Sequence, residues 1–245
     1  FFNTTTTTTT VVTCFVSPSE EEEIAAALEA RVTKLEHIRY KCPKGILVDD
    51  SMRRARASVE AAGIYGARWK WVPPQYYDKS LADRAKMLQV SSTKVLCKAL
   101  LLENKKYAGN SNVDTNPKFV MVILQYEATL DVKKLQLALR SLIQPVTERI
   151  NYDYDFRVAS PADNDRLTGY QFNSVTPFGL LVPNEIKMVL AKSVMGDDAS
   201  NTFFWMGGGH VHLKLGLAVS DFIASTNALV ADVSSPRGAG DTDFD

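Results

Sequence analysis

The chain has 245 residues, 28 basic and 28 acidic side chains, and 45% hydrophobic residues. This length is sufficient for one large domain with an extension, and the mixed composition excludes a collagen-like fibre or a chain that is disordered throughout. Because the formal net charge is zero, nucleic-acid binding by bulk positive charge is excluded, and any RNA site must be a local patch.

No apolar run approaches the roughly 20 residues that are needed to cross a bilayer. The three cysteines, Cys14, Cys42 and Cys97, are widely spaced and form no CxxC motif. This pattern favours a reducing compartment over a disulfide framework or a zinc knuckle. We therefore expect a soluble, cytoplasmic protein.

The N-terminal segment opens with a low-complexity run from Thr4 to Thr10, so residues 1–18 are expected to form a disordered linker. A helix is predicted from Ser19, acting as N-cap, to about Cys42. Apolar residues recur along it at spacings of three and four: Ile24, Leu28, Val32, Leu35 and Ile38. This stripe predicts packing within the chain, with docking of a partner helix as the alternative.

Two shorter helices are predicted over 51–62 and 80–88. Together with the first helix they make a helical extension over residues 19–90. Between them, Arg68 and Lys70 alternate with Trp69 and Trp71. This interleaving is typical of a local nucleic-acid patch, and a solvated face is the alternative.

From residue 91 the sequence changes to short apolar runs of strand length, at 95–102, 119–126, 186–190, 202–206, 212–217 and 229–233. The run 119–124 lacks polar alternation, which predicts a central strand covered on both faces. Helices are expected from Asp131, from Ser160 with Pro161 in the first turn, and over 219–225. Residues 91–233 therefore read as a mixed α+β domain, followed by a disordered tail over 234–245.

A glycine run, Gly207 to Gly209, follows a predicted strand and precedes His210 and His212. Glycines there allow the backbone to approach a ligand closely, and a bulge or tight hairpin is the alternative. Two histidines at this spacing share one face of a strand, but no third metal ligand is recognisable. No metal and no cofactor are predicted.

One lysine stands out in the first predicted strand, because Lys98 is a lone cation among apolar neighbours and such a group is rarely buried without a partner or a function. A lysine that faces the edge of the sheet is the alternative. The adjacent Cys97 reads as a small core residue. A later loop, residues 169–181, combines turn formers with aromatic residues and could line a pocket.

In this order, these segments resemble the YbaK and prolyl-tRNA-synthetase-associated domain family of aminoacyl-tRNA editing deacylases. The resemblance spans roughly residues 79–233. The matching segments are the lysine strand 98–102, the helix start 130–135, the loop 167–170 with 175–179, and the glycines 207–209 with Lys214, Leu215, Leu217 and Asp221.

The resemblance implies an α+β fold with a mixed, strongly curved, barrel-like β-sheet flanked by helices. It implies trans-editing hydrolysis of the ester between a wrong amino acid and the tRNA 3′ adenosine. Lys98 would contact the adenosine or its phosphate, while Gly207 and Gly208 would stabilise the oxyanion. The expected substrate-binding residues are Tyr170, Asn173, Ser174, Pro177, Phe178, Gly179, Gly209, His210 and His212, and the expected tRNA-binding residues are Lys214, Arg68 and Lys70.

Two features qualify the resemblance. Asn173 stands where the family has glycine before Pro177, although asparagine tolerates a left-handed conformation. The three glycines resemble the YbaK branch and not the alanine-specific branch. This resemblance favours small or Cys-like amino acids as substrates. The expected partners are mischarged aminoacyl-tRNA and, through the N-terminal helix, a synthetase or multi-synthetase complex, without a membrane. A non-catalytic tRNA or synthetase-binding module and an unrelated small-molecule enzyme are the alternatives.

Overall fold

The computed structural model describes residues 17–109, 113–196 and 202–238, and the chain divides into two compact units, Phe1–Val48 and Asp49–Asp245. The first unit contains helix α1 (Pro18–Tyr40). Its N-cap is Ser17 and not the predicted Ser19, because Ser17 and Glu20 exchange side-chain to backbone hydrogen bonds in a capping box. The predicted threonine linker lies outside the described residues.

The apolar stripe of α1 is confirmed as a feature of the helix surface. Its five side chains, Ile24, Leu28, Val32, Leu35 and Ile38, are 51–66% exposed. Since they stay at least half exposed, the stripe forms no hydrophobic core with residues 17–48, the described part of its unit. In the described part of the chain, no helix is both long and apolar enough to span a membrane.

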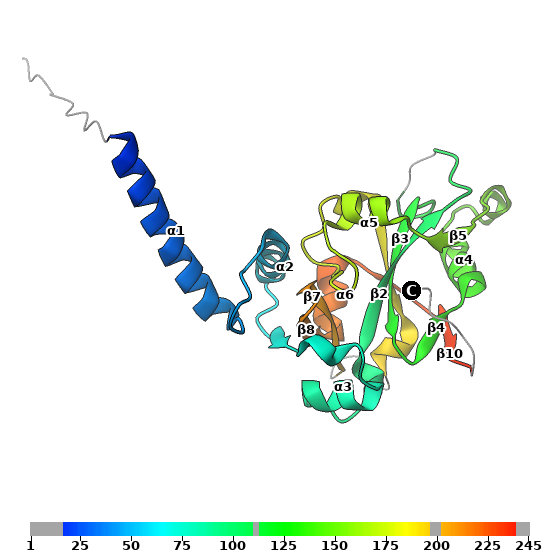
Figure 1. Cartoon of the computed structure of the whole chain (residues 1–245). Coiled ribbons are helices and arrows are strands. Elements are labelled where there is room, and N and C mark those ends of the chain that lie inside the picture. The colour runs from blue at the N-terminus through cyan, green and yellow to red at the C-terminus, as the bar shows by residue number, and fades with distance from the viewer. Residues whose placement is uncertain (1–16, 110–112, 197–201, 239–245) are drawn as a thin grey trace, which may run out of the picture. The chain divides into compact units, whose positions relative to one another are not determined.

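The second unit is built on three sheets (Figure 1). A five-stranded sheet has the order β5-β2-β3-β6-β9, a three-stranded sheet has the order β1-β8-β7, and β10 pairs with β4. The strands are β1 (Arg68–Trp71), β2 (Cys97–Asn104), β3 (Phe119–Gln125), β4 (Ala128–Leu130), β5 (Phe156–Val158), β6 (Ile186–Ala191), β7 (Phe203–His210), β8 (Leu213–Ala218), β9 (Leu229–Ala231) and β10 (Ser234–Pro236).

The five-stranded sheet is mixed, as the family resemblance implied. β2 pairs antiparallel with β3 and β5, whereas β3–β6 and β6–β9 are parallel. Every residue of 119–124 has 0% exposure, which confirms β3 as the central strand covered on both faces. The sheets are not closed into a barrel within the described residues; a single bridge between Leu96 and Trp205 links the two larger sheets.

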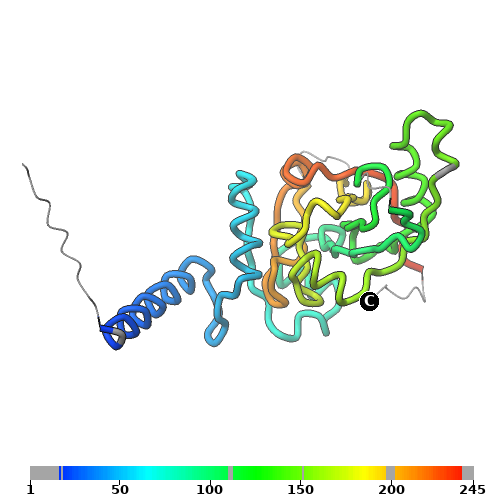
Figure 2. Tube along the Cα trace, turned by 90° about the horizontal axis from the view of Figure 1, so that it is seen from above, coloured from blue at the N-terminus to red at the C-terminus, as the bar shows by residue number. Residues whose placement is uncertain are grey.

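The helices of this unit are α2 (Asp50–Ala61), α3 (Leu81–Leu88), α4 (Val132–Ser141), α5 (Pro161–Thr168) and α6 (Val219–Thr226). The predicted caps Ser80, Asp131 and Ser160 each accept a hydrogen bond from the first turn of α3, α4 and α5. Figures 1 and 2 show α4 on one side of strands β2 and β3 and the β7–β8 hairpin on the other.

Three features differ from the predicted organisation. The predicted helical extension over 19–90 is interrupted by β1, which pairs with β8 over four residues and belongs to the second unit. The predicted disordered tail contains β10, because Ser234 to Pro236 pair with β4; residues 239–245 lie outside the described residues. The glycines 207–209 lie within β7, where the register shifts between Gly207 and His210. The alternative of a bulge is therefore confirmed.

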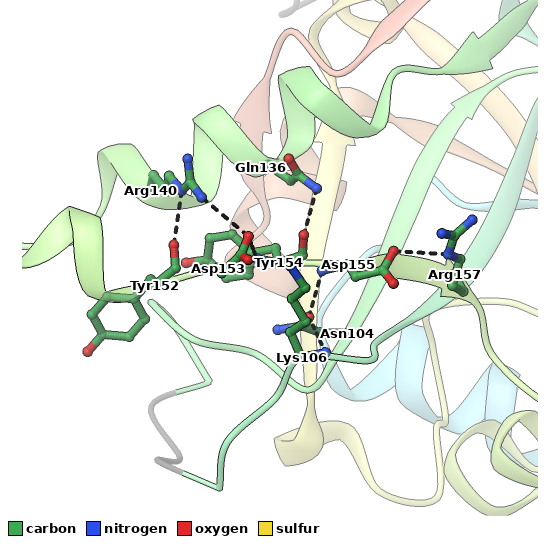
Figure 3. A network of polar contacts seen from close by, with 9 residues as sticks. All are labelled: Asn104, Lys106, Gln136, Arg140, Tyr152, Asp153, Tyr154, Asp155 and Arg157. Carbon is green, nitrogen blue, oxygen red and sulfur yellow. Dashed lines mark hydrogen bonds and ion pairs between the residues drawn. The ribbon is translucent and has the colours of Figure 1, made fainter.

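A polar network fixes the segment that leads into β5 (Figure 3). The Oδ1 atom of Asn104, at the end of β2, accepts the backbone amides of Lys106 and Asp155 at 3.1 and 3.0 Å. From α4, Gln136 donates to the Tyr154 carbonyl and Arg140 to the Tyr152 carbonyl. The buried Asn104 and the partly buried Gln136 and Arg140 therefore satisfy backbone groups in the segments next to the short strand β5.

Candidate functional site

The hydroxyl of Tyr77 lies where the loop around Asn173, strand β8 and the end of β3 meet. It donates to the backbone carbonyl of Asn173 at 2.8 Å and accepts a hydrogen bond from Lys214 on β8. A side-chain hydrogen bond also joins it to Tyr126, which follows β3. Burial and the neighbouring Tyr126 raise the pKa of Tyr77, so its hydroxyl stays protonated and remains a donor.

Lys214 is the most buried cation of this cluster, at 4% exposure. Its Nζ atom lies 4.4 Å from the centre of the Tyr77 ring and 5.0 Å from that of Tyr76, and it donates to the Val211 carbonyl at 3.4 Å. Burial, with the charge of Arg84 as a second cause, lowers the pKa of Lys214 to about 7. No carboxylate among the described residues forms an ion pair with this amine.

Two further cations contact the same tyrosines. Arg84 on α3 lies 5.6 Å from the centre of the Tyr76 ring, 5.3 Å from that of Tyr77 and 5.5 Å from that of Tyr126. Lys98 on β2 is 9% exposed, and its Nζ atom lies 5.8 Å from the centre of the Tyr126 ring. Aromatic faces stabilise buried cations, so these tyrosines allow three positive charges to gather in one place.

A small cavity lies beside this cluster. Its volume is about 10 Å³, and its lining includes Lys214, Tyr126, Gly207 and Cys97; that volume is close to the least that holds one water molecule. Burial raises the pKa of the Cys97 thiol, which makes it a poor nucleophile and supports its predicted role as a core residue.

A larger depression of about 710 Å³ lies between the three-stranded sheet and residues 88–95, which connect α3 to β2. Arg68 and Lys70 lie at its β1 edge, with Phe203 and Trp205 from β7. Arg68 lies 5.2 Å from the centre of the Phe203 ring. The structure therefore brings the two predicted tRNA-binding residues of β1 to one concave surface, whereas the third, Lys214, is buried beneath the tyrosines.

Residues 171–179, the central part of the predicted loop 169–181, pack directly on the glycines of β7, and Figure 2 shows them beside the orange strands β7 and β8. A Cβ atom on Gly207 would lie 2.4 Å from the Val175 carbonyl oxygen, which no side chain could accommodate without a backbone shift. The Gly209 amide donates to the Ser174 carbonyl at 3.1 Å. These glycines thus permit the loop to lie against the strand.

Helix α2 holds the other end of the loop. Arg54 donates to the carbonyls of Gly169 and Gly179 at 2.8 and 3.3 Å, and its guanidinium lies 5.3 Å from the centre of the Tyr170 ring. The Tyr170 hydroxyl in turn donates to the Phe178 carbonyl. Gly179 has φ +69°, and a Cβ atom there would clash with the α2 backbone. Arg54 is therefore a structural residue of the loop.

Most of the predicted substrate-binding side chains are buried where the loop packs against β7 and α2. Tyr170, Ser174 and Phe178 are 1–3% exposed, and Pro177 is also buried. Asn173 is exposed and has φ +65°, so it adopts the left-handed conformation expected of the family glycine. Only the Asn173 region of the loop therefore offers both an exposed side chain and a carbonyl directed toward the tyrosine cluster.

The two histidines lie at the far end of β7. The rings of His210 and His212 contact each other edge to face at 5.5 Å, and His210 contacts Trp71 at 5.4 Å. Burial lowers the pKa of His210. Across residues 17–109, 113–196 and 202–238, no group of three or more His, Cys, Asp or Glu side chains is arranged to hold a metal ion.

Sequence reasoning did not identify the aromatic part of the site. Tyr76 and Tyr77 belong to a short segment after Pro73 and Pro74 that is far from β8 in sequence. The one sequence feature that could have indicated it is the pair Tyr76-Tyr77, which follows Pro73-Pro74 after a single residue. Its contact with Lys214 depends on tertiary packing, which no local pattern predicts.

Comparison with known proteins gives a family match and matches to solved structures, three of which are described below. A family model described as the aminoacyl-tRNA editing domain matches residues 78–224, more than half of the chain. A search of curated proteins found no match. The family match begins after α2 and β1, although both elements contribute to the second compact unit.

The structural matches have low sequence identity and show the fold alone. A crystal structure of a proposed trans-editing enzyme for prolyl tRNA synthetase has a TM-score of 0.56 at 19% identity, covering 77% of this chain and 99% of the other. A scaffold protein from a computational epitope-grafting study has a TM-score of 0.57 at 18% identity, with the same coverage. The hypothetical protein APE2540 has a TM-score of 0.53 at 20% identity, covering 74% and 99%.

Proposed function

The chain belongs to the aminoacyl-tRNA editing domain family, and from this premise we propose that it is a trans-editing hydrolase that deacylates mischarged aminoacyl-tRNA. The observation that carries the proposal is the meeting of three matched segments at Tyr77. The Asn173 loop and the β8 lysine contact its hydroxyl, and Lys98 approaches it through Tyr126. A cationic, water-poor site of this kind suits a substrate that ends in a phosphate-linked adenosine.

The proposed reaction is ester hydrolysis. Water attacks the aminoacyl carbonyl, the tetrahedral oxyanion collapses, and the ribose oxygen of the adenosine leaves as a hydroxyl, so that free amino acid and tRNA are the products. We assign the contact with the terminal adenosine or its phosphate to Lys98 and oxyanion stabilisation to backbone amides around Gly207 and Gly208. Preorganised donors at the developing charge are the strongest single contribution that such a site can make.

We propose that the tRNA acceptor end lies along the depression beside β1. Arg68 and Lys70 supply positive charge at its edge, and Phe203 supplies an aromatic ring. A net-neutral protein needs a local patch of this kind to bind RNA. Binding to this face is expected to weaken as the salt concentration rises.

For the amino acid, the proposal rests on the resemblance of Gly207, Gly208 and Gly209 to the YbaK branch. The inner cavity of about 10 Å³ beside Lys214 and Gly207 holds no more than one water molecule, so it does not itself select the amino acid. From this resemblance we propose small or Cys-like amino acids as substrates and the cytoplasm as the site of action. The exposed stripe of α1 is the segment that we propose for contact with a synthetase or multi-synthetase complex.

The test is deacylation of a panel of tRNAs charged with Ala, Ser, Cys or the cognate amino acid, with tRNA for proline among them. We expect release of at least one small non-cognate amino acid and retention of the cognate one. If every amino acid is released from its tRNA equally slowly with and without the protein, the proposal is contradicted.

A non-catalytic tRNA-binding module is the second candidate. It is favoured by one observation: the side chains of Tyr170, Ser174 and Phe178 are buried in loop packing, which leaves few groups to contact an aminoacyl moiety. This candidate predicts salt-sensitive binding of tRNA without release of amino acid. The same panel, combined with a filter-binding assay, separates the two.

A further inference from the structure

We propose that Tyr77 and Lys214 are positioning residues that hold the Asn173 end of the substrate loop in its binding conformation. The loop's role as a binding element rests on the proposed function, but its attachment to these two side chains does not. Neither residue carries this role in the family resemblance, which assigned Lys214 to tRNA contact and did not include Tyr77.

The first support is the direction of the hydrogen bonds. The Tyr77 hydroxyl has one proton, and this proton is directed to the Asn173 carbonyl at 2.8 Å. An ammonium group can only donate, so Lys214, when charged, must place its own proton on the Tyr77 oxygen. Tyr126, the other hydroxyl that is hydrogen-bonded to Tyr77, must likewise donate to the Tyr77 oxygen, so that the single Tyr77 proton is left for the loop.

The second support is the backbone of Asn173 itself. This residue is exposed and has φ +65°, a conformation that non-glycine residues adopt only when their surroundings favour it. On its C-terminal side, the Ser174 carbonyl accepts the Gly209 amide from β7. The Tyr77 hydroxyl is the contact from outside the loop at Asn173, so it anchors the residue that replaces the family glycine.

The third support is the shielding of the pair. Two aromatic rings cover Lys214, those of Tyr76 and Tyr77, and Tyr126 lines the same cavity. Three basic residues also face it: Arg84 on α3, Lys70, which is its partner on β1, and His210 on β7. All the charged groups in this set are cations or titrate as bases. Burial among them lowers the pKa of Lys214 to about 7, within the range where its protonation changes under ordinary conditions.

The consequence is a defined pH dependence. Below pH 7, the charged amine cannot accept, and the Tyr77 proton stays on the Asn173 carbonyl. Above pH 7, the neutral amine becomes an acceptor and competes with Asn173 for that proton. Attachment of the loop should therefore weaken as the pH rises through about 7.

The experiment measures hydrogen exchange of the loop peptide 171–179 in the full chain by mass spectrometry, with rates corrected for the intrinsic effect of pH. Tyr77→Phe keeps the ring and removes the hydroxyl, and we expect loop exchange to rise about 3- to 10-fold. Tyr76→Phe is the matched control, because its ring also faces Lys214 while its hydroxyl has no hydrogen bond to the loop; exchange should change less than about twofold.

Lys214→Arg tests the pH dependence, since arginine donates like the charged lysine but does not lose its proton. In the wild type, protection of the loop should fall between about pH 6 and pH 8, and in Lys214→Arg it should stay constant. Unchanged exchange in Tyr77→Phe would overturn the inference, as would the same pH dependence in wild type and Lys214→Arg.

Deacylation rates of the same variants separate this inference from the proposed function. An inactive wild type with the expected exchange behaviour would reject the hydrolase and leave the loop attachment standing. If the wild type is active but Tyr77→Phe leaves the hydrogen exchange of the loop unchanged, the loop attachment alone is rejected. A fall in kcat/KM for Tyr77→Phe that is larger than the fall for Tyr76→Phe is the result expected if both hold.

Discussion

Gly207 shows how a single residue without a side chain shapes the site. The carbonyl oxygens of Val175 and Ser174 occupy the space where a Cβ atom would lie, at 2.4 and 3.2 Å. Both are backbone atoms of the loop, so they cannot move away as a flexible side chain could. The glycine therefore serves loop packing, whether or not its amide also contacts a substrate.

We expect Gly207→Ala to displace the loop and to lower the free energy of unfolding by about 1–3 kcal/mol, a typical cost of overpacking. Gly66→Ala is the matched control, because the nearest atom to a Cβ there is a carboxylate oxygen of Asp221 at 4.0 Å. Urea denaturation of both variants checks this expectation. Equal stabilities would show that the loop does not need the glycine.

At the scale of elements, the network in Figure 3 shows how a three-residue strand is kept in place. Asn104 is 1% exposed, and two backbone amides depend on its oxygen. The ion pair between Lys106 and Asp153 lies at the surface of the same network, with both side chains more than half exposed. Buried acceptors and exposed ion pairs differ greatly in their contribution to stability.

Asn104→Ala is expected to destabilise the protein by about 1–3 kcal/mol, since two backbone amides in part-buried hydrogen bonds lose their acceptor. Lys106→Ala, in the same network, should change stability by less than about 1 kcal/mol. Thermal or urea unfolding of the two variants measures the difference. A larger effect from Lys106→Ala would mean that the surface ion pair and not the buried amide holds the segment before β5.

Local patterns predicted the elements whose signals lie within a few residues. Asp131 and Ser160 were recognisable as caps, and the uninterrupted apolar run 119–124 identified the central strand. The strands that escaped prediction depend on distant partners: β1 pairs with β8, β4 with β10, and β5 with β2. Their short sequences carry no strong periodicity, so tertiary pairing decides their state.

For the site, the sequence indicated Lys98, the loop and the glycines, but not what joins them. Three tyrosines join these segments. Tyr76 and Tyr77 are adjacent, whereas Tyr126 is far from them in sequence and follows the end of β3. Burial also changed the interpretation of Lys214, because its position on β8 gave no sign that the rings of Tyr76 and Tyr77 would cover it.

At the scale of the whole molecule, the compact unit is larger than the family match. The second unit begins at Asp49, whereas the match begins at residue 78. The intervening residues supply α2, whose Arg54 holds the loop, and β1, which completes the three-stranded sheet. We infer that this segment is part of the folding unit.

A protein comprising residues 49–245 should therefore unfold cooperatively, with a Tm within about 5 °C of that of the full chain. Residues 78–245 alone should aggregate or fail to unfold cooperatively, because β8 becomes an unpaired edge and the loop loses Arg54. Calorimetry of the two truncated proteins compares them directly. A stable fragment 78–245 would show that α2 and β1 are accessory.

Single-turnover deacylation by Lys98→Ala tests the central claim most directly. Lys94→Ala is the control, because Lys94 is an exposed lysine four residues earlier in the chain. If the site is an aminoacyl-tRNA hydrolase in which Lys98 holds the terminal adenosine or its phosphate, Lys98→Ala should lower the rate about 100-fold, and Lys94→Ala should leave it within about twofold. Wild-type release of amino acid that persists undiminished in Lys98→Ala would contradict the account.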